Sequence, residues 1–187
     1  MKLPLIGAVV KIANAYAFKG NPRYVIELAS WDDWWKRIVK KAFIVAVIAL
    51  VLTLIGTMSE PAVNQNDIAR QLLGVFPSLL GFGIGVFALV FVLPPSFVHH
   101  LQSEREALGF DASILAPDMA YPLLVLVVVL FIGACLLFLP PTFLGLYIAG
   151  FSLFYGIAVS LELVSMIFTT GYRIIRTNRL SDDSEQG

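Results

Sequence analysis

Glu162 is the residue most able to do chemistry, because it is an acid inside a long apolar segment of the chain. A carboxylate within a membrane-spanning helix is costly, so it should face a helix bundle, a water-filled pocket or a partner. It is then an intramembrane ion or proton site or an oligomer contact, unless it is a structural hydrogen-bonding group for a neighbouring serine or tyrosine. No base lies at comparable depth in another apolar segment, so no ion pair is expected for it.

Other groups that catalyse reactions or bind metals are few and poorly spaced. His99 and His100 are adjacent, and neighbouring side chains of a helix point to different sides, which suits a shared metal poorly. Cys135 is the only cysteine, which excludes an intramolecular disulfide and a metal site made of several cysteines. The sequence has no nucleophile elbow, phosphate-binding loop or zinc-binding pattern. We therefore predict a protein that is not an enzyme and that holds neither a cofactor nor a metal.

Long apolar helices must position Glu162. Of the 187 residues, 58% are hydrophobic and 14% are charged, whereas soluble domains carry about 25% charged residues. A bilayer core of roughly 30 Å is crossed by about 20 apolar residues in a helix. Apolar stretches of this kind occupy residues 42–58, 72–93, 121–139 and 143–170. The predicted fold is all-α, a bundle of four transmembrane helices over residues 42–172, followed by a partly disordered cytoplasmic tail at 173–187.

Residues 1–41 are predicted to form cytoplasmic or interfacial amphipathic helices ahead of the first span. Over residues 3–18, at about 100° per residue, the apolar side chains share one broad arc, and Lys11 and Asn14 lie opposite. This pattern is typical of a helix that lies on a surface, either lipid or protein.

Ser30, followed three residues later by Asp33, is a variant capping box that starts the next helix. Aromatic and basic side chains that anchor a span at the membrane interface follow it: Trp31, Trp34, Trp35, Lys36, Arg37, Lys40 and Lys41. Indole rings favour the headgroup zone, and bases favour anionic headgroups. The expected partner of this segment is therefore the lipid bilayer and not a nucleic acid.

Basic residues are distributed unevenly around the predicted spans. Eight lie in residues 1–41, one in 96–120 and three in the tail, against one in the segment that follows the first span. By the positive-inside rule, both chain ends and the 96–120 loop are cytoplasmic. The loop has a net charge of −3 and residues 1–41 have a net charge of +5. We expect the loop to pair with the N-terminal segment or to bind a cytosolic protein.

The second and fourth spans carry small residues at helical spacing, whereas the first span is interpreted as a plain anchor. The small residues are Gly74, Ser78, Gly81 and Gly85 in the second span, and Ser152, Gly156 and Ser160 in the fourth. Small residues let helix backbones approach closely in lipid. We expect these faces to pack helices together, within the chain or in an oligomer. The alternative is a pore or substrate path lined by glycine.

The run from Phe76 to Ala88 resembles a stretch in small, uncharacterised bacterial and prophage-encoded membrane proteins with several spans. The resemblance implies the bacterial inner membrane and carries over no activity and no functional residues. We predict a non-enzymatic subunit that anchors or assembles a membrane complex, either as a homo-oligomer or with other subunits of that complex. The alternative is an oligomeric ion channel, pore or small transporter that uses Glu162 and the glycine-rich second span.

Overall fold

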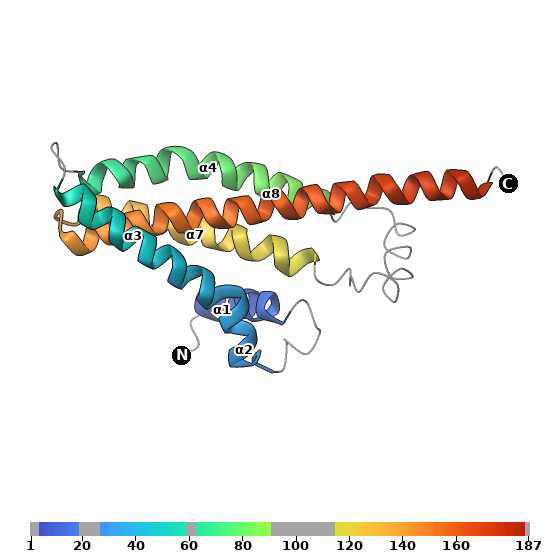
Figure 1. The fold of residues 1–187 in the computed structure, drawn as a ribbon, viewed down its shortest axis with the longest axis horizontal. Coiled ribbons are helices and arrows are strands. Elements are labelled where there is room, and N and C mark those ends of the chain that lie inside the picture. Colours follow the sequence, from blue (N-terminus) through green and yellow to red (C-terminus); the bar gives the residue numbers. More distant parts are fainter. Residues whose placement is uncertain (1–3, 19–26, 59–62, 91–114, 186–187) are drawn as a thin grey trace.

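The computed structural model describes residues 4–18, 27–58, 63–90 and 115–185, and every regular element in these ranges is a helix (Figure 1). The helices are α1 (Pro4–Ala17), α2 (Trp31–Trp34), the π-helical turn η2 (Trp35–Val39), α3 (Lys40–Met58), α4 (Gln65–Val90), α7 (Leu115–Phe138) and α8 (Phe143–Glu185). Within the described residues, four helical stretches are long and apolar enough to cross a membrane: Trp31–Met58, Gln65–Leu89, Ala116–Phe138 and Phe143–Thr169. The predicted all-α class with four spans is confirmed, and the chain is a multi-pass membrane protein.

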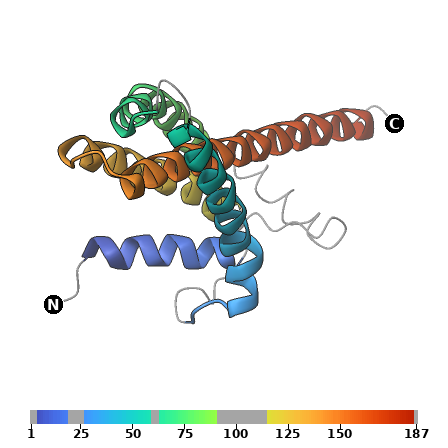
Figure 2. The same cartoon turned by 60° about the vertical axis from the view of Figure 1, so that its left-hand side comes forward.

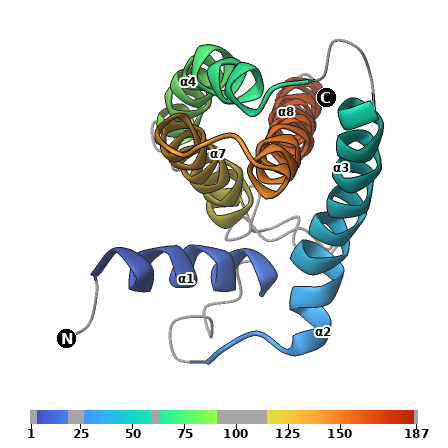
Figure 3. The same cartoon turned by 90° about the vertical axis from the view of Figure 1, so that its left-hand side faces the viewer.

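Successive spans run in opposite directions, so α3 and α7 point one way and α4 and α8 the other (Figure 1). Helices α4, α7 and α8 pack on one another as a three-helix core, and α3 lies outside this core against α8 (Figure 3). Helix α3 starts beside the C-terminal end of α1 and crosses α8 (Figure 2). The four spans therefore form an asymmetric bundle and are not arranged as a ring around a central axis.

Large apolar side chains fill the centre of the three-helix core. The central cluster is Leu72, Phe76, Leu126, Val129, Tyr155 and Val159. Gly156 makes room for the Phe76 ring, because a Cβ added at this glycine would lie 2.6 Å from the ring's Cζ. Ser152 is buried on the same helix. The small residues of α8 thus allow the close approach of α4 that small residues permit in lipid.

Helix α3 also packs through small residues, although the first span was expected to be a plain anchor. Its buried residues are Ala49, Thr53 and Gly56. A Cβ added at Gly150 of α8 would lie 3.6 Å from the Thr53 Oγ1, which is ordinary contact. The four-residue spacing of Ala49 and Thr53 was the available sequence signal, because residues at that spacing share one helix face.

The turn between α7 and α8 is held by a side chain from α4. Gln65 is buried, its Nε2 donates to the Leu136 carbonyl at 2.9 Å, and its Oε1 accepts from the Thr142 backbone N–H at 3.1 Å. Helix ends leave such backbone groups without intrahelical partners. Thr142 caps α8, because its Oγ1 accepts from the Gly145 N–H at 3.0 Å. The last two spans therefore form a complete hairpin around residues 139–142.

Three helices extend further than the apolar runs predicted. Helix α4 begins at Gln65 in place of residue 72, and α7 begins at Leu115 in place of residue 121. Helix α8 continues to Glu185, so the backbone of the expected disordered tail is helical up to that residue. Apolar runs mark the lipid-buried part of a helix, whereas its hydrogen bonds continue into polar sequence. Residues 91–114, with most of the predicted 96–120 loop, lie outside the described residues.

Ser152 supports a stability prediction, because its buried hydroxyl has no hydrogen-bond partner within the described residues. A buried polar group without a partner costs about 1–3 kcal/mol. We expect Ser152→Ala to raise the free energy of unfolding by about 1 kcal/mol, measured by denaturant titration in detergent micelles. Ser160→Ala is the matched control, because it removes a 2.8 Å hydrogen bond to the Gly156 carbonyl. Equal effects of the two changes would contradict the prediction.

Candidate functional site

Glu162 lies on the side of α8 that faces α1 and α3. Its Oε2 accepts from the Lys41 Nζ at 2.5 Å, and its Oε1 accepts from the Tyr16 hydroxyl. The expectation that Glu162 has no ion pair is therefore wrong. In the sequence, Lys41 precedes the first predicted span and Glu162 lies inside the fourth, so position along each helix does not show that the two residues meet. Helix α3 lies obliquely across α8 (Figure 1), and this crossing brings the Lys41 side chain at its start into contact with Glu162.

Tyr16 of α1 joins both charged groups. Its buried hydroxyl donates to Glu162 and accepts from the Lys41 Nζ at 2.8 Å. Burial, together with the hydrogen bond to the Glu162 carboxylate, raises the pKa of Tyr16 well above its usual range, so the phenol keeps its proton. Its ring stacks on Tyr121 of α7 with 4.2 Å between centroids, and the Tyr121 hydroxyl lies 2.7 Å from the Tyr155 hydroxyl of α8. One side chain thus connects α1 to α3, α7 and α8.

Arg37 and Asp118 form a second ion pair beside the first. The two guanidinium NH groups donate to the two Asp118 oxygens at 2.8 and 3.4 Å, and one of them also donates to the Tyr16 carbonyl at 2.6 Å. That carbonyl belongs to the last turn of α1, where carbonyls lack intrahelical partners and a cation complements the helix dipole. Asp118 belongs to the 96–120 segment, so this contact is an instance of the expected pairing with residues 1–41.

We call Tyr16, Arg37, Lys41, Asp118 and Glu162 the polar cluster. Its two bases balance its two acids. The bases also lie over the Tyr16 ring, with the Arg37 Cζ 4.7 Å and the Lys41 Nζ 5.1 Å from its centroid, which is within cation–π range. The desolvation that a partly buried ion pair requires is offset when hydrogen bonds satisfy the remaining polar groups. The polar cluster is therefore well suited to hold α1 against the spans.

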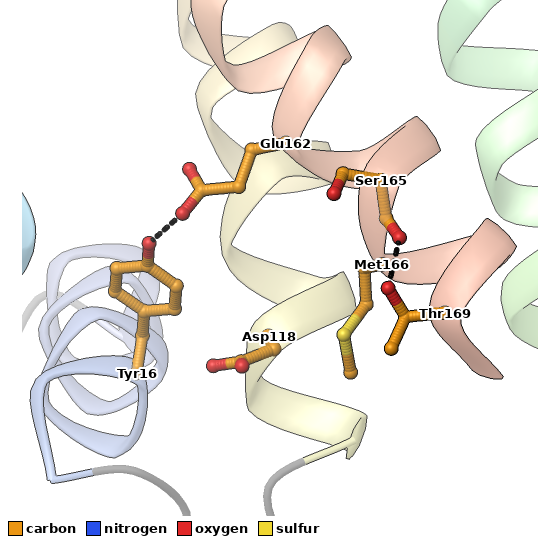
Figure 4. A pocket seen from close by; sticks show the side chains of 6 residues that line it. All are labelled: Tyr16, Asp118, Glu162, Ser165, Met166 and Thr169. Carbon is orange, nitrogen blue, oxygen red and sulfur yellow. Dashed lines mark hydrogen bonds between the residues drawn. The ribbon is translucent and has the colours of Figure 1, made fainter. Parts of the chain in front are cut away.

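A pocket of about 230 Å³ opens beside the polar cluster, between α1, α7 and α8 (Figure 4). It is lined by Tyr16, Asp118, Glu162, Ser165, Met166 and Thr169. The acids of both ion pairs line it, whereas neither base does. The Thr169 hydroxyl donates to the Ser165 carbonyl at 2.8 Å. Because each acid is already held by a base, the arrangement is suited to holding helices together.

Local sequence features place Arg37 and Lys41. The predicted capping box is present: the Ser30 Oγ accepts from the Asp33 N–H at 3.3 Å, and its hydroxyl donates to the Asp33 Oδ2 at 2.6 Å. The helix continues through η2 into α3 without a break. Arg37 and Lys41 are four residues apart, so they face the same side of this helix.

Asn14 fastens α1 to the segment that precedes α2. Its side chain donates to the Glu27 carbonyl at 2.8 Å and accepts from the Ala29 N–H at 2.7 Å. The sequence had placed Asn14 opposite the apolar arc, on the expected polar side of the helix, but this residue is buried. An amide with both a donor and an acceptor can satisfy two backbone groups at once, which explains its burial.

Five of the seven predicted interfacial anchors stay at or near the surface: Trp31, Trp34, Trp35, Lys36 and Lys40. Trp31 is 73% exposed and Trp35 is 44% exposed, as lipid-facing indoles would be on an isolated chain. Arg37 and Lys41 instead turn inward and join the polar cluster. The basic residues ahead of the first span therefore divide into a surface group and a group that binds α7 and α8.

The small residues of α4 are placed differently from those of α8. We call Gly74, Ser78, Gly81 and Gly85 the open face of α4. A Cβ added at any of its three glycines would meet no atom within 4 Å, and its serine is exposed. Gly83 is the glycine of α4 that packs, because a Cβ there would lie 2.5 Å from Leu123 and 3.0 Å from Leu163. No helix among the described residues covers the open face.

Sequence reasoning missed Tyr16 and Asp118 as members of the site. Tyr16 was assigned to the apolar arc of the first helix, and its hydroxyl was not matched with an acid. The available signal was a balance of charge at the ends of three spans: Arg37 and Lys41 precede the first span, and an acid lies in each of the third and fourth. Such a balance predicts that ion pairs form, but it does not predict which base pairs with which acid.

Comparisons with protein-family models, curated proteins and solved structures found no match for this chain. The resemblance of residues 76–88 to small bacterial and prophage-encoded membrane proteins therefore stays a prediction. The function must be inferred from the geometry of the chain itself.

Proposed function

We propose that the chain is a non-enzymatic subunit of the bacterial inner membrane, with both ends in the cytoplasm, that self-assembles through the open face of α4. The open face is the observation that carries this proposal. In lipid, helices associate mainly by close packing of small residues. A strip of glycine and serine turned toward lipid offers little contact area there, whereas the same strip on a second copy allows two backbones to approach.

The open face has the dimensions of a helix crossing. Its residues follow one another at intervals of four, three and four positions, which places them on one side of α4. From Gly74 to Gly85 the strip is about 17 Å long, roughly half of the bilayer core. Gly83, on another side, already fixes α4 to the core through Leu123 and Leu163. A two-fold contact would pair the open face with itself.

An ion channel or small transporter that uses Glu162 is the alternative, and it gains less support. Both Glu162 oxygens accept hydrogen bonds, from Tyr16 and from Lys41. Helices α1 and α4 lie on opposite sides of α7 (Figure 3). Assembly through the open face of α4 would therefore leave Glu162 away from the shared axis.

Gly85→Leu is expected to abolish self-association and to leave the fold of the chain intact. The new Cβ would meet no atom of its own chain within 4 Å, whereas the leucine side chain would separate two α4 helices in contact. The measurements are particle mass by light scattering in lipid nanodiscs and the unfolding midpoint by circular dichroism.

Two neighbouring substitutions are matched controls for Gly85→Leu. Gly83→Leu should lower the unfolding midpoint, because Leu123 and Leu163 occupy the space beside this glycine. Ile84→Leu, at an exposed position, should change neither the mass nor the midpoint. A monomeric wild-type protein in lipid, or an oligomer that survives Gly85→Leu, would overturn the proposal.

A further inference from the structure

Helix α1 lies crosswise to the spans. Figure 1 shows the spans from the side and α1 strongly foreshortened, whereas Figure 3 looks along the bundle and shows α1 at full length. A helix that is perpendicular to membrane-crossing helices runs parallel to the membrane plane. This is the orientation of an interfacial amphipathic helix.

The polar cluster places α1 at the depth of the membrane boundary. Glu162 follows Phe143, the first residue of α8, by nineteen positions. This separation is about 29 Å along an α-helix, close to the roughly 30 Å thickness of the hydrocarbon core. With Phe143 at one boundary, Glu162 stands at the other, and Tyr16 stands beside it.

The first half of α1 reaches beyond α7 (Figure 3), and apolar side chains of this half are exposed. Val9 is 38% exposed and Val10 is 43% exposed, although both belong to the apolar arc that also includes the buried Tyr16. Lys11 is exposed and lies on the side opposite Val9. The exposed part of α1 therefore keeps its amphipathic character where the bundle no longer covers it.

We propose that the bilayer surface covers the apolar side of the first half of α1, while the polar cluster fastens the second half to the spans. The depth of α1, its orientation and the position of Lys11 opposite Val9 all match those of a helix at a lipid surface. Interfacial helices bury an apolar face at the acyl boundary and direct bases outward. Tyr16, held by α3, α7 and α8, sets the depth of the helix. The proposal goes beyond assembly through α4 and does not depend on it.

Spin labels on opposite sides of α1 test this proposal on the full chain. The native Cys135 is first replaced by serine, because it is exposed and would also be labelled. Val9→Cys and Lys11→Cys are then labelled with a nitroxide in vesicles of phosphatidylcholine and phosphatidylglycerol. Power saturation compares collision with oxygen, which concentrates in lipid, and with a nickel chelate, which stays in water.

The label at residue 9 should collide more with oxygen, and the label at residue 11 should collide more with the nickel chelate. The ratio of oxygen to nickel collisions should therefore be higher at residue 9 than at residue 11. Preference for the nickel chelate at both positions would place the helix in water and overturn the proposal. Low accessibility to both reagents at residue 9 would show that protein covers this side, which also overturns it. Val10→Cys repeats the lipid-facing measurement if the first label disturbs folding.

Discussion

Lys41→Glu is expected to lower the free energy of unfolding by about 2–4 kcal/mol, between the values for exposed and buried ion pairs. The intermediate value follows from exposure, because the Lys41 and Glu162 side chains are 33% and 35% exposed. The change sets two carboxylates against each other and removes the ammonium that Tyr16 and Glu162 share. Adding Glu162→Lys should recover most of the loss, because opposite charges then face each other again. Denaturant titration in detergent micelles measures both variants.

Lys40→Glu is the matched control for this charge exchange. Lys40 is exposed and adjacent to Lys41, so the control makes the same change in net charge at nearly the same depth. We expect it to change the free energy of unfolding by less than about 0.5 kcal/mol. If the double variant loses as much stability as its two single changes together, Lys41 and Glu162 are not coupled, and the polar cluster does not hold α1 in place.

Gly145→Ala is expected to cost about 2–4 kcal/mol, because it displaces a buried side chain that satisfies two backbone groups. The new Cβ would overlap the Gln65 Oε1 and lie 2.6 Å from its Cδ. Gln65 has little freedom to move, since it is held by the Leu136 carbonyl and the Thr142 N–H. Replacing glycine by alanine otherwise stabilises a helix by about 1 kcal/mol. A net loss of stability would therefore show that the α7–α8 turn is disturbed. The unfolding midpoint in detergent micelles measures the effect.

Gly171→Ala is the control, because the same change in the same helix meets open space. It should be neutral or should stabilise the chain by up to about 1 kcal/mol through helix propensity. Gln65→Ala combined with Gly145→Ala should cost less than the sum of the two single changes, because both disturb the same hydrogen bonds. Strict additivity, or a stabilising Gly145→Ala, would show that Gln65 does not hold the α7–α8 turn.

The spans could be predicted from the sequence, because lipid burial requires long apolar runs and leaves a strong signal. The residues at which these helices begin and end could not be predicted. Gln65 is polar, and the apolar run starts after it, yet it begins α4 and binds the α7–α8 turn. Its role depends on two backbone groups more than seventy residues away in the sequence. No local pattern identifies such partners.

The packing faces show a similar limit. Helical spacing correctly grouped Gly81 with Gly85, but it could not say which side of α4 meets another helix. Gly83 lies on the side of α4 that packs against other helices, because Leu123 of α7 and Leu163 of α8 contact it. Tyr16 was likewise assigned to the correct side of its helix without its partners. Periodicity determines which residues share a face, whereas the neighbour of that face depends on how the helices assemble.

Helix α8 continues well past the level of the polar cluster. From Glu162 to Glu185 it extends by about 35 Å, as one element with the span that begins at Phe143. A continuous helix transmits rotation and displacement along its axis better than a flexible linker does. A protein that binds the last turns of α8 would therefore be held at a set distance from the bilayer. Twisting that distal end would apply a torque to the Glu162 side of the bundle.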